Sequence, residues 1–398
     1  MPDDAWLAAE TARLIDFARA SRVEGGFASL DDDGAPDVGR PLELYVTARM
    51  THVFALGHLL GRPGCRELVD HGVEALVRTF EDREHGGWFD AVRGRLPEGT
   101  DKGCYGHVFV VLAASSAVAA GRPAAVALLD RALAVVQERF WSEPEGACLE
   151  AWDRAWTAPE DYRGANANMH AVEALLAAGD VTGERVWHER AHAIADKLIG
   201  GYARDAGWRV PEHYTSDWKL VPDYNADHPN HPFRPYGITP GHGLEWARLV
   251  LQLRATLPGT HNWMLEAAQG LFERAVAEGW DDATGGFAYT VDWDGSPVVA
   301  DRFHWVVAEA IGAAAALRTA TGDDAWSGWE ERFWAFAREH LVDDARGGWI
   351  HELDEHNVPG SRTWEGKPDT YHALQATLIP RVPLAPALAP ALARGALA

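Results

Sequence analysis

Two kinds of hydrophobic segment alternate along the chain. Segments such as 5–21 and 66–80 are amphipathic, with apolar residues at helical spacing along one side. Segments such as 108–120, 171–178 and 308–317 are apolar nearly all round, and a helix of that kind has to be buried. The alternation therefore predicts a set of partly exposed helices that surrounds a set of buried ones.

A glycine-rich turn recurs six times between these segments. The clearest copies are Gly-Gly-Phe at 25–27 and Gly-Gly-Trp at 86–88. The third residues of the six turns stand at positions 27, 88, 148, 208, 287 and 349, so the steps between copies are 61, 60, 60, 79 and 62 residues. A near-constant period indicates one repeat architecture and not several unrelated domains. We predict an all-α fold, a single (α/α)6 barrel over residues 1–398, with six helix pairs forming an inner and an outer ring.

The long fourth step marks an insertion around residues 214–240. This stretch is polar and rich in His, Pro and aromatic residues. Loops longer than about 12–15 residues are usually functional or disordered, and the aromatic and proline content favours a structured lid over the barrel mouth. The Ala/Pro/Leu-rich segment 383–398 is low in complexity and predicts a closing helix followed by a frayed end.

Polar residues interrupt the buried segments near their N-terminal ends. In a barrel of this kind, these ends line a central pocket. Any one of the residues could be a hydrogen-bonded core group, but their recurrence at matching positions in six repeats favours a shared pocket. The candidates are Tyr45, Arg49, His52, Tyr105, His107, Asn166, His170, His242, Glu245, Trp305, Glu309, Tyr371 and His372.

Two of these histidines stand in the first turn of a predicted helix. Thr239 precedes His242 as a possible N-cap, and Asp369 precedes His372 in the same way. The positive end of a helix dipole disfavours an imidazolium, so we expect both rings to be biased toward the neutral form, which can accept a proton. Glu245 would oppose this bias at His242 or orient its ring. Two such histidines in one pocket indicate general acid–base catalysis.

Charge and cysteine content exclude several classes of protein. The 59 acidic and 36 basic residues give a net charge of −23, which disfavours nucleic acid and anionic membranes as partners. The longest apolar stretch, 108–120, is too short to span a membrane, and the acidic N-terminus lacks a signal-peptide core. Three cysteines without CxxC spacing predict a reducing, cytoplasmic setting and no cysteine-based zinc site. The 18 Trp residues suggest stacking faces for sugars or bases.

Other chemistries find less support in the sequence. It contains no HExxH, EF-hand, GxSxG or phosphate-binding glycine loop. The His-rich segment 228–231 lacks the carboxylates that a metal site would need, so we expect no metal and no cofactor. Glycoside hydrolysis needs two carboxylates that flank the sugar, for which Glu245 and Glu309 are candidates. The prevalence of His, Tyr, Asn and Arg instead favours proton abstraction next to a carbonyl.

At these motifs the sequence resembles the N-acylglucosamine 2-epimerase superfamily, whose members are (α/α)6 barrels that act on free sugars. The resemblance covers nearly the whole chain and is greatest in the branch of the mannose isomerases and sulfoquinovose isomerases. Cellobiose 2-epimerases and N-acetylglucosamine 2-epimerases are more distant. The matching segments are ELYVTARMTH (43–52), DKGCYGHVFV (101–110), NANMHAVEA (166–174), RPYGITPGHGLEWARL (234–249) and DTYHA (369–373).

The resemblance implies roles for individual residues. His242 and His372 resemble the catalytic pair of the isomerases. In the last repeat, however, His351 or Glu352 stands where a sulfosugar enzyme is expected to carry an amide, and the surrounding segment 352–355 is acidic. Both points favour a neutral hexose. The residues that the resemblance implies for sugar binding are Arg49, Tyr105, Asn166, His170, Arg234, Glu245 and Trp305.

The resemblance implies a metal-independent aldose–ketose isomerase that interconverts D-mannose and D-fructose through a cis-enediolate. We expect His372 to transfer the proton at carbon and His242 to act at oxygen, although these roles could be exchanged. Arg49 and Tyr105 are candidates to stabilise the enediolate oxygen. The alternatives are a 2-epimerase that interconverts mannose and glucose, a sulfoquinovose isomerase, an (α/α)6 glycoside hydrolase and a sugar-binding module. The expected partner is a free monosaccharide, and the expected state is a monomer or weak homo-oligomer.

Overall fold

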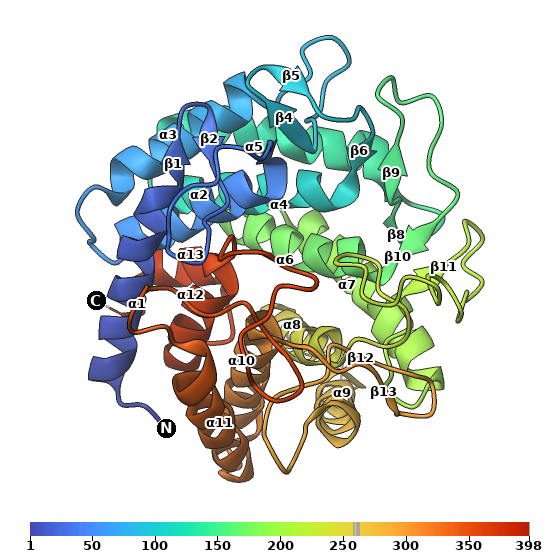
Figure 1. Ribbon diagram of the computed structural model, residues 1–398. Helices are drawn as coiled ribbons and strands as arrows, with labels where there is room; N and C mark the ends of the chain where they lie inside the picture. Colours follow the sequence, from blue (N-terminus) through green and yellow to red (C-terminus); the bar gives the residue numbers. More distant parts are fainter. Residues whose placement is uncertain (258, 260–262, 398) are drawn as a thin grey trace.

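Twelve helices form two concentric rings in the computed structural model, which describes residues 1–257, 259 and 263–397 (Figure 1). The inner ring consists of α2 (Leu44–Leu59), α4 (Cys104–Ala119), α6 (Ala165–Thr182), α8 (Pro240–Thr256), α10 (His304–Thr321) and α12 (Thr370–Leu378). The outer ring consists of α1 (Asp4–Ala18), α3 (Cys65–Arg78), α5 (Pro123–Val135), α7 (Arg185–Ala195), α9 (Trp263–Gly279) and α11 (Ala325–Phe336).

The inner ring is closed. Each inner helix packs against the next one in the chain, and α12 packs against α2. Five outer helices pack on the inner helix that precedes them, whereas α1 packs mainly on α12. The first and last helices of the barrel therefore lie side by side, as Figure 1 shows. The predicted (α/α)6 barrel is confirmed.

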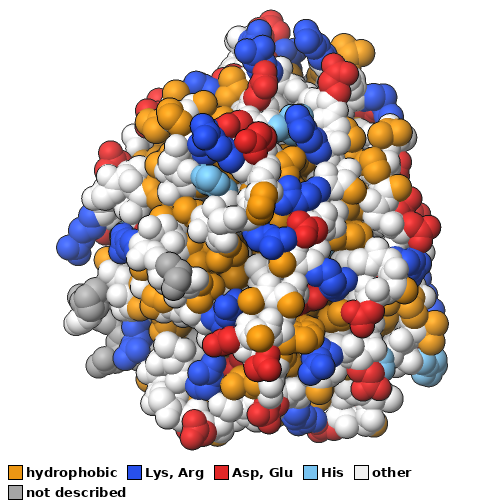
Figure 2. All heavy atoms as spheres, turned by 90° about the vertical axis from the view of Figure 1, so that its left-hand side faces the viewer, with side chains coloured by type: hydrophobic (Ala, Val, Ile, Leu, Met, Phe, Trp, Pro, Cys, Tyr) orange, Lys and Arg blue, Asp and Glu red, His pale blue; other side chains and the backbone are white. Residues whose placement is uncertain are grey.

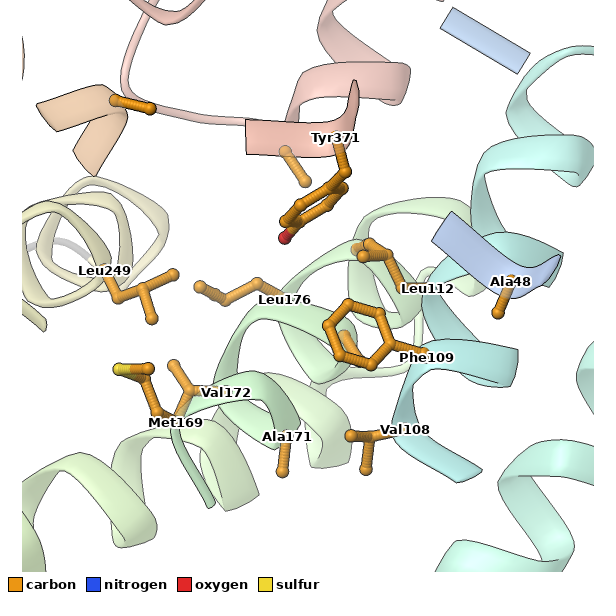
Figure 3. Close-up of a cluster of buried hydrophobic side chains, with 14 of the residues drawn as sticks. Ala48, Val108, Phe109, Leu112, Met169, Ala171, Val172, Leu176, Leu249 and Tyr371 are labelled. Carbon is orange, nitrogen blue, oxygen red and sulfur yellow. The ribbon is translucent and has the colours of Figure 1, made fainter. Parts of the chain in front are cut away.

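Burial explains why the two sets of helices differ in composition. In α4, every residue from Gly106 to Ala117 is buried. In α3, the buried Leu68, Val69, Val73 and Leu76 recur at helical spacing along one side. Side chains from several inner helices converge on the barrel interior, including Phe109, Leu112, Leu176 and Tyr371 (Figure 3). Full burial of one large apolar side chain contributes about 1.5–3 kcal/mol.

Short antiparallel strands link neighbouring repeats at one end of the barrel. The pairs β3–β4, β6–β9, β10–β11 and β14–β15 join the residues before an inner helix to the strand that follows the next glycine turn. Hairpins β1–β2 and β7–β8 close two of the turns. The strands are β1 (Arg22–Val23), β2 (Gly26–Phe27), β3 (Leu42–Glu43), β4 (Ala91–Arg93), β5 (Leu96–Pro97), β6 (Lys102–Gly103), β7 (Trp141–Ser142), β8 (Ala147–Cys148), β9 (Ala151–Trp152), β10 (Arg163–Gly164), β11 (His213–Tyr214), β12 (Thr290–Val291), β13 (Pro297–Val299), β14 (Arg302–Phe303) and β15 (Glu352–Leu353).

The segment 383–398 contains the short helix α13 (Leu388–Ala393). It packs on α2, α4 and α6, and the Asp180 carboxylate accepts a hydrogen bond of 2.6 Å from the Ala387 N–H. Residue 398 lies outside the described residues. Short π-helical or 3-10 turns follow several helices: Arg19–Ser21, Val136–Phe140, Asp196–Ala203, Ala337–Leu341 and Ile379–Arg381.

The outer surface carries charges of both signs. Figure 2 shows acidic and basic side chains interspersed over the face near the two termini, so the excess of acidic residues forms no continuous patch on that face. Within the described part of the chain, every helix is too short or too polar to traverse a lipid bilayer.

Candidate active site

A cavity lies at the N-terminal ends of the inner helices, and all six of these helices contribute to it. Loops between the strands and the inner helices complete its wall. Its lining residues are Tyr45, Arg49, Tyr105, Asn166, His170, Pro232, Phe233, His242, Glu245, Tyr289, His304, Trp305, His351, Trp364, Pro368, Asp369 and His372.

Nearly all of the residues that the sequence proposed for catalysis and sugar binding line this cavity. The exception is Arg234, which lines a neighbouring cavity instead. Its guanidinium donates two hydrogen bonds of 2.7 and 2.8 Å to Glu160 and lies over the ring of Tyr162. This bidentate ion pair holds the Arg234 side chain outside the lining of the central cavity. The residues that the structure brings together are Arg49, Tyr105, Asn166, His170, His242, Glu245, Trp305 and His372.

His242 is oriented by a carboxylate that stands 30 residues earlier in the chain. Its Nδ1 lies 2.8 Å from the Glu212 carboxylate, and the Glu212 side chain is almost fully buried. A carboxylate at Nδ1 fixes the proton on that nitrogen and leaves Nε2 for the cavity. The expectation that Glu245 orients this ring was wrong, because Glu245 faces His170 and Arg248. Thr239 does occupy the N-cap position, but its side chain makes no capping bond.

His372 is oriented by the N-cap residue of its own helix. Asp369 accepts a hydrogen bond from the His372 backbone N–H at 3.2 Å and lies 2.5 Å from Nδ1 of the same residue. The Arg49 guanidinium donates to Asp369 at 3.2 Å and to the Tyr105 hydroxyl at 2.9 Å. Burial opposes the negative charge of Asp369, but His372 and Arg49 hold its pKa well below its usual range. Sequence analysis identified this aspartate only as a cap.

Two further histidines hold the backbone of Asp369. The His351 Nε2 accepts a hydrogen bond of 2.9 Å from the Asp369 N–H, and its Nδ1 donates to the Trp349 carbonyl. The His304 Nε2 lies 3.2 Å from the Asp369 carbonyl oxygen. The two rings contact each other with centroids 3.8 Å apart. Burial lowers the pKa of His304 to about 4 and that of His351 well below its usual range, so both rings support Asp369 as neutral groups.

Sequence reasoning missed Glu212 and the contribution of His351, although both occupy the same place in their repeats. There, a backbone carbonyl accepts from the first N–H of the preceding inner helix, at 3.0 Å for Glu212 and 3.1 Å for His351. Asp90 and Glu150 make the same bond at 2.8 and 2.7 Å. In their repeats, Asp90, Glu150 and His351 all stand two positions after the third residue of the glycine turn. This fixed spacing is a sequence pattern that could have identified them. Glu212 stands four positions after that residue of its own turn, so the repeat spacing hides it.

Trp305 lies against both proposed catalytic histidines. Its ring centroid is 5.4 Å from that of His242 and 5.9 Å from that of His372. The close approach of α8 requires a glycine at position 241, since a Cβ there would lie 2.5 Å from the Trp305 ring. Trp305 therefore forms a flat apolar wall between the two histidines, of the kind that packs against the C–H face of a sugar.

The floor of the cavity is a buried polar network. Glu245 lies 3.5 Å from the His170 Nδ1, and its Oε1 has no hydrogen-bond partner among the described residues. Burial and the nearby Glu309 raise the pKa of Glu245 well above its usual range, which favours its protonated form, a hydrogen-bond donor. Glu309 itself accepts from Arg248 at 2.9 Å.

Four residues proposed for the shared pocket lie outside its lining: His52, His107, Glu309 and Tyr371. The His107 Nε2 accepts a hydrogen bond of 3.0 Å from the Trp88 N–H, and its Nδ1 donates to the Gly103 carbonyl at 2.6 Å. His52 lies deeper in the barrel, with its Nδ1 2.7 Å from the Ser116 hydroxyl. Both histidines are buried groups that satisfy other core atoms, so their assignment to the pocket was wrong.

Among the described residues, three groups of side chains bring possible metal-ligand atoms within 4.8 Å of one another. All of them lie in or beneath the central cavity, away from the segment 228–231. In the first group, the Nδ1 of His372 and the carboxylate of Asp369 already bind each other. The groups are His304, Asp369 and His372; His170, Glu173 and Glu245; and Glu245, Glu309 and His372.

Comparison with known proteins identifies close relatives. The family model of N-acylglucosamine 2-epimerase (GlcNAc 2-epimerase) matches residues 25–376. The chain is 53% identical over 394 residues to a D-mannose isomerase of Thermobifida fusca, covering 98% of this chain and 97% of the relative. It is 50% identical over 393 residues to a D-mannose isomerase of Pseudomonas cannabina pv. alisalensis, covering 98% and 95%. A crystal structure of a D-mannose isomerase matches with a TM-score of 0.88 at 31% identity, covering 95% of this chain and 97% of the other.

Proposed function

Because the chain belongs to the N-acylglucosamine 2-epimerase family, we propose that it is an aldose–ketose isomerase that interconverts D-mannose and D-fructose. Relatives that share about half of its residues along nearly the full length carry the name D-mannose isomerase. The observation that carries the proposal is the pair His242 and His372, each with a carboxylate at Nδ1. In the described part of the chain, neither Nε2 makes a hydrogen bond.

The reaction requires proton transfers at oxygen and at carbon. The sugar ring first opens, when a proton leaves the anomeric hydroxyl and another reaches the ring oxygen. A base then removes the C2 proton, and the electron pair moves to form a cis-enediolate across C1 and C2. Delivery of a proton to C1 and transfer of the O2 proton to O1 give the ketose. We assign the carbon steps to Nε2 of His372 and the oxygen steps to Nε2 of His242, each worth roughly 10²–10⁴-fold.

The carboxylates make both histidines effective in these transfers. Each holds the Nδ1 proton in place and offsets the positive charge when Nε2 takes up a proton. Asp369 is the more firmly held of the two, since Arg49 and its own N-cap hydrogen bond restrain it. Arg49 and Tyr105 lie beside it and supply donors for the developing enediolate oxygen. Asn166, His170, Glu245 and Trp305 provide the remaining contacts to the sugar.

The charges near the cavity favour a neutral hexose over a sulfosugar. A sulfonate needs a cation to bind it, but Arg49 is already paired with Asp369 and Arg234 with Glu160. Burial raises the pKa of Glu245 and favours its neutral form, which suits a sugar hydroxyl as a hydrogen-bond partner. These contacts support a neutral aldose as the substrate.

NMR spectroscopy of the enzyme with D-mannose in D₂O tests the proposal. We expect fructose to appear, with deuterium from the solvent at C1, and EDTA to leave the rate unchanged. Glucose without fructose would instead identify a 2-epimerase. Conversion of sulfoquinovose in preference to mannose would overturn the choice of a neutral hexose. If mannose stays unchanged while an oligosaccharide is cleaved, the chain is a glycoside hydrolase and the proposal fails.

A further inference from the structure

A second cavity of about 660 Å³ adjoins the central one. The two cavities share part of their lining, so these common residues form the partition between them. A volume of this size lies in the range that holds small ligands, and nothing in the isomerisation of a single hexose uses it. The shared residues are Tyr45, Tyr105, Asn166 and Phe233.

Phe233 is the part of the partition that comes from a loop. Its ring packs edge-on against Tyr45 and Tyr105, with centroids 5.6 and 5.4 Å away, and against Trp364 at 5.5 Å. Only its backbone carbonyl makes a hydrogen bond in the partition, accepting from Asn166 Nδ2 at 3.2 Å. By contrast, the Tyr105 hydroxyl holds Arg49. Removing the Phe233 ring would therefore open the partition without breaking the hydrogen bonds that arrange the central site.

The second cavity has the chemistry of a sugar subsite. Asp90, Glu150 and Glu160 line it and can accept hydrogen bonds from hydroxyl groups. The Glu150 side chain is only 11% exposed, and its Oε2 has no hydrogen-bond partner among the described residues. Trp152 adds an aromatic face. The one basic residue among those lining this cavity in the structure, Arg234, is already paired with Glu160.

We propose that Phe233 is a specificity-determining residue: its ring confines the substrate to a single hexose, and the cavity behind it accommodates a second sugar residue once the ring is removed. This inference rests on the proposed function, because the reducing-end hexose of the larger substrate would occupy the central cavity and react there. The mechanism at C1 and C2 is then the same for a monosaccharide and for a disaccharide.

The test compares the wild-type enzyme with Phe233→Ala on D-mannose and on mannobioses linked through O3, O4 or O6 of the reducing sugar. Product formation is followed by NMR spectroscopy. We expect Phe233→Ala to raise kcat/KM for at least one mannobiose by roughly tenfold or more, while it still converts mannose. Phe233→Leu should give a smaller gain and serves if the alanine variant melts at a much lower temperature. No gain with any of the three mannobioses in either variant would overturn the inference.

Two further variants separate this explanation from a general loosening of the site. Trp364 contacts the Phe233 ring and lines only the central cavity, so Trp364→Ala is the matched control and should give no gain with mannobiose. An equal gain would refute the role of Phe233 as the partition. Adding Trp152→Ala to Phe233→Ala should remove the mannobiose gain but leave mannose conversion as in Phe233→Ala; a retained gain would refute the second subsite. If the wild-type enzyme fails to convert mannose, the proposed function itself fails.

Discussion

The beginnings of α4 and α12 are similar in sequence but differ in what faces the cavity. Both carry a tyrosine and a histidine in the first turn: Tyr105 and His107 in α4, and Tyr371 and His372 in α12. In α4 the tyrosine lines the cavity, and the histidine is buried behind it. In α12 the histidine lines the cavity, and the tyrosine is buried, where it donates to Glu173. The same two residue types therefore exchange roles.

The angle between successive residues on a helix explains this exchange. Residues two apart, such as Tyr105 and His107, point to nearly opposite sides of a helix with 3.6 residues per turn. Tyr371 and His372 are adjacent, and the phase of α12 decides which of them faces inward. The environments then differ: backbone groups occupy both ring nitrogens of His107, and burial lowers its pKa to about 3. In His372, Nδ1 is bound by Asp369, and Nε2 has no hydrogen-bond partner among the residues that the structure describes.

The largest expected effect is a loss of kcat when a histidine that lines the cavity is replaced. We expect His372→Ala and His242→Ala each to reduce kcat for mannose at least about a hundredfold, or about 2.7 kcal/mol in activation free energy. Both variants should remain folded, but each leaves a buried carboxylate, Glu212 or Asp369, without its histidine partner and should lower the melting temperature, so kcat is measured on the folded fraction. Near-normal turnover in one variant would remove that histidine from the catalytic pair.

At the start of α4, replacing the buried histidine should lower the stability of the protein and leave kcat nearly unchanged. His107→Ala leaves the Trp88 N–H and the Gly103 carbonyl without their partners, which should lower the free energy of unfolding by roughly 1–3 kcal/mol. The folded fraction should keep near-normal kcat, because His107 does not line the cavity. Urea denaturation and steady-state kinetics on the same sample check both halves. A hundredfold loss of kcat with unchanged stability would reverse the assignment of the two histidines.

The carboxylates that bind Nδ1 of the two catalytic histidines, Glu212 and Asp369, should differ in their effects on kcat and KM. We expect Glu212→Gln to lower kcat at least about tenfold, since the carboxylate fixes the proton on His242, and to leave KM within roughly threefold. Asp369→Asn should lower kcat and also raise KM, because Asp369 holds Arg49 as well. Steady-state kinetics with mannose measures the difference. Equal changes in KM for both variants would contradict the link between Asp369 and Arg49.

The smallest effect is expected at Glu245, whose raised pKa favours the neutral acid. Glu245→Gln preserves a neutral group of the same shape and should keep kcat within roughly tenfold of the wild type. The pKa of Glu245 is higher in the folded protein than in the unfolded chain. The stability of the wild type is therefore greatest below the unfolded-state pKa of this group, and it falls as the pH rises through the folded-state pKa. The melting temperature of Glu245→Gln relative to wild type should therefore rise between pH 5 and 9. A difference independent of pH would show that Glu245 is ionised in the folded protein.

The local parts of the site were accessible from the sequence. Asp369 and His372 are three residues apart across a helix start, so an N-cap pattern identifies both. The repeat pattern placed Arg49 and Trp305 among the pocket candidates, and the resemblance to known isomerases implied their roles in sugar binding. Glu212 escaped notice because it stands 30 residues before His242, on the other side of the 214–240 insertion, and nothing in the local pattern joins the two. Arg234 has the residue type suited to a sugar ligand, but only its contact with Glu160 shows where its side chain lies.

By itself, the sequence determined the repeat, the two rings of helices and the end of the barrel that carries the polar residues. These follow from periodicity, since a helix that is apolar all round must be enclosed. The tertiary structure decided which polar residue of each inner helix faces the cavity and which distant groups meet there. Arg49 and Asp369 lie 320 positions apart and form an ion pair. They meet because α12 packs against α2 and closes the ring, and that closure depends on the packing of all six helix pairs together.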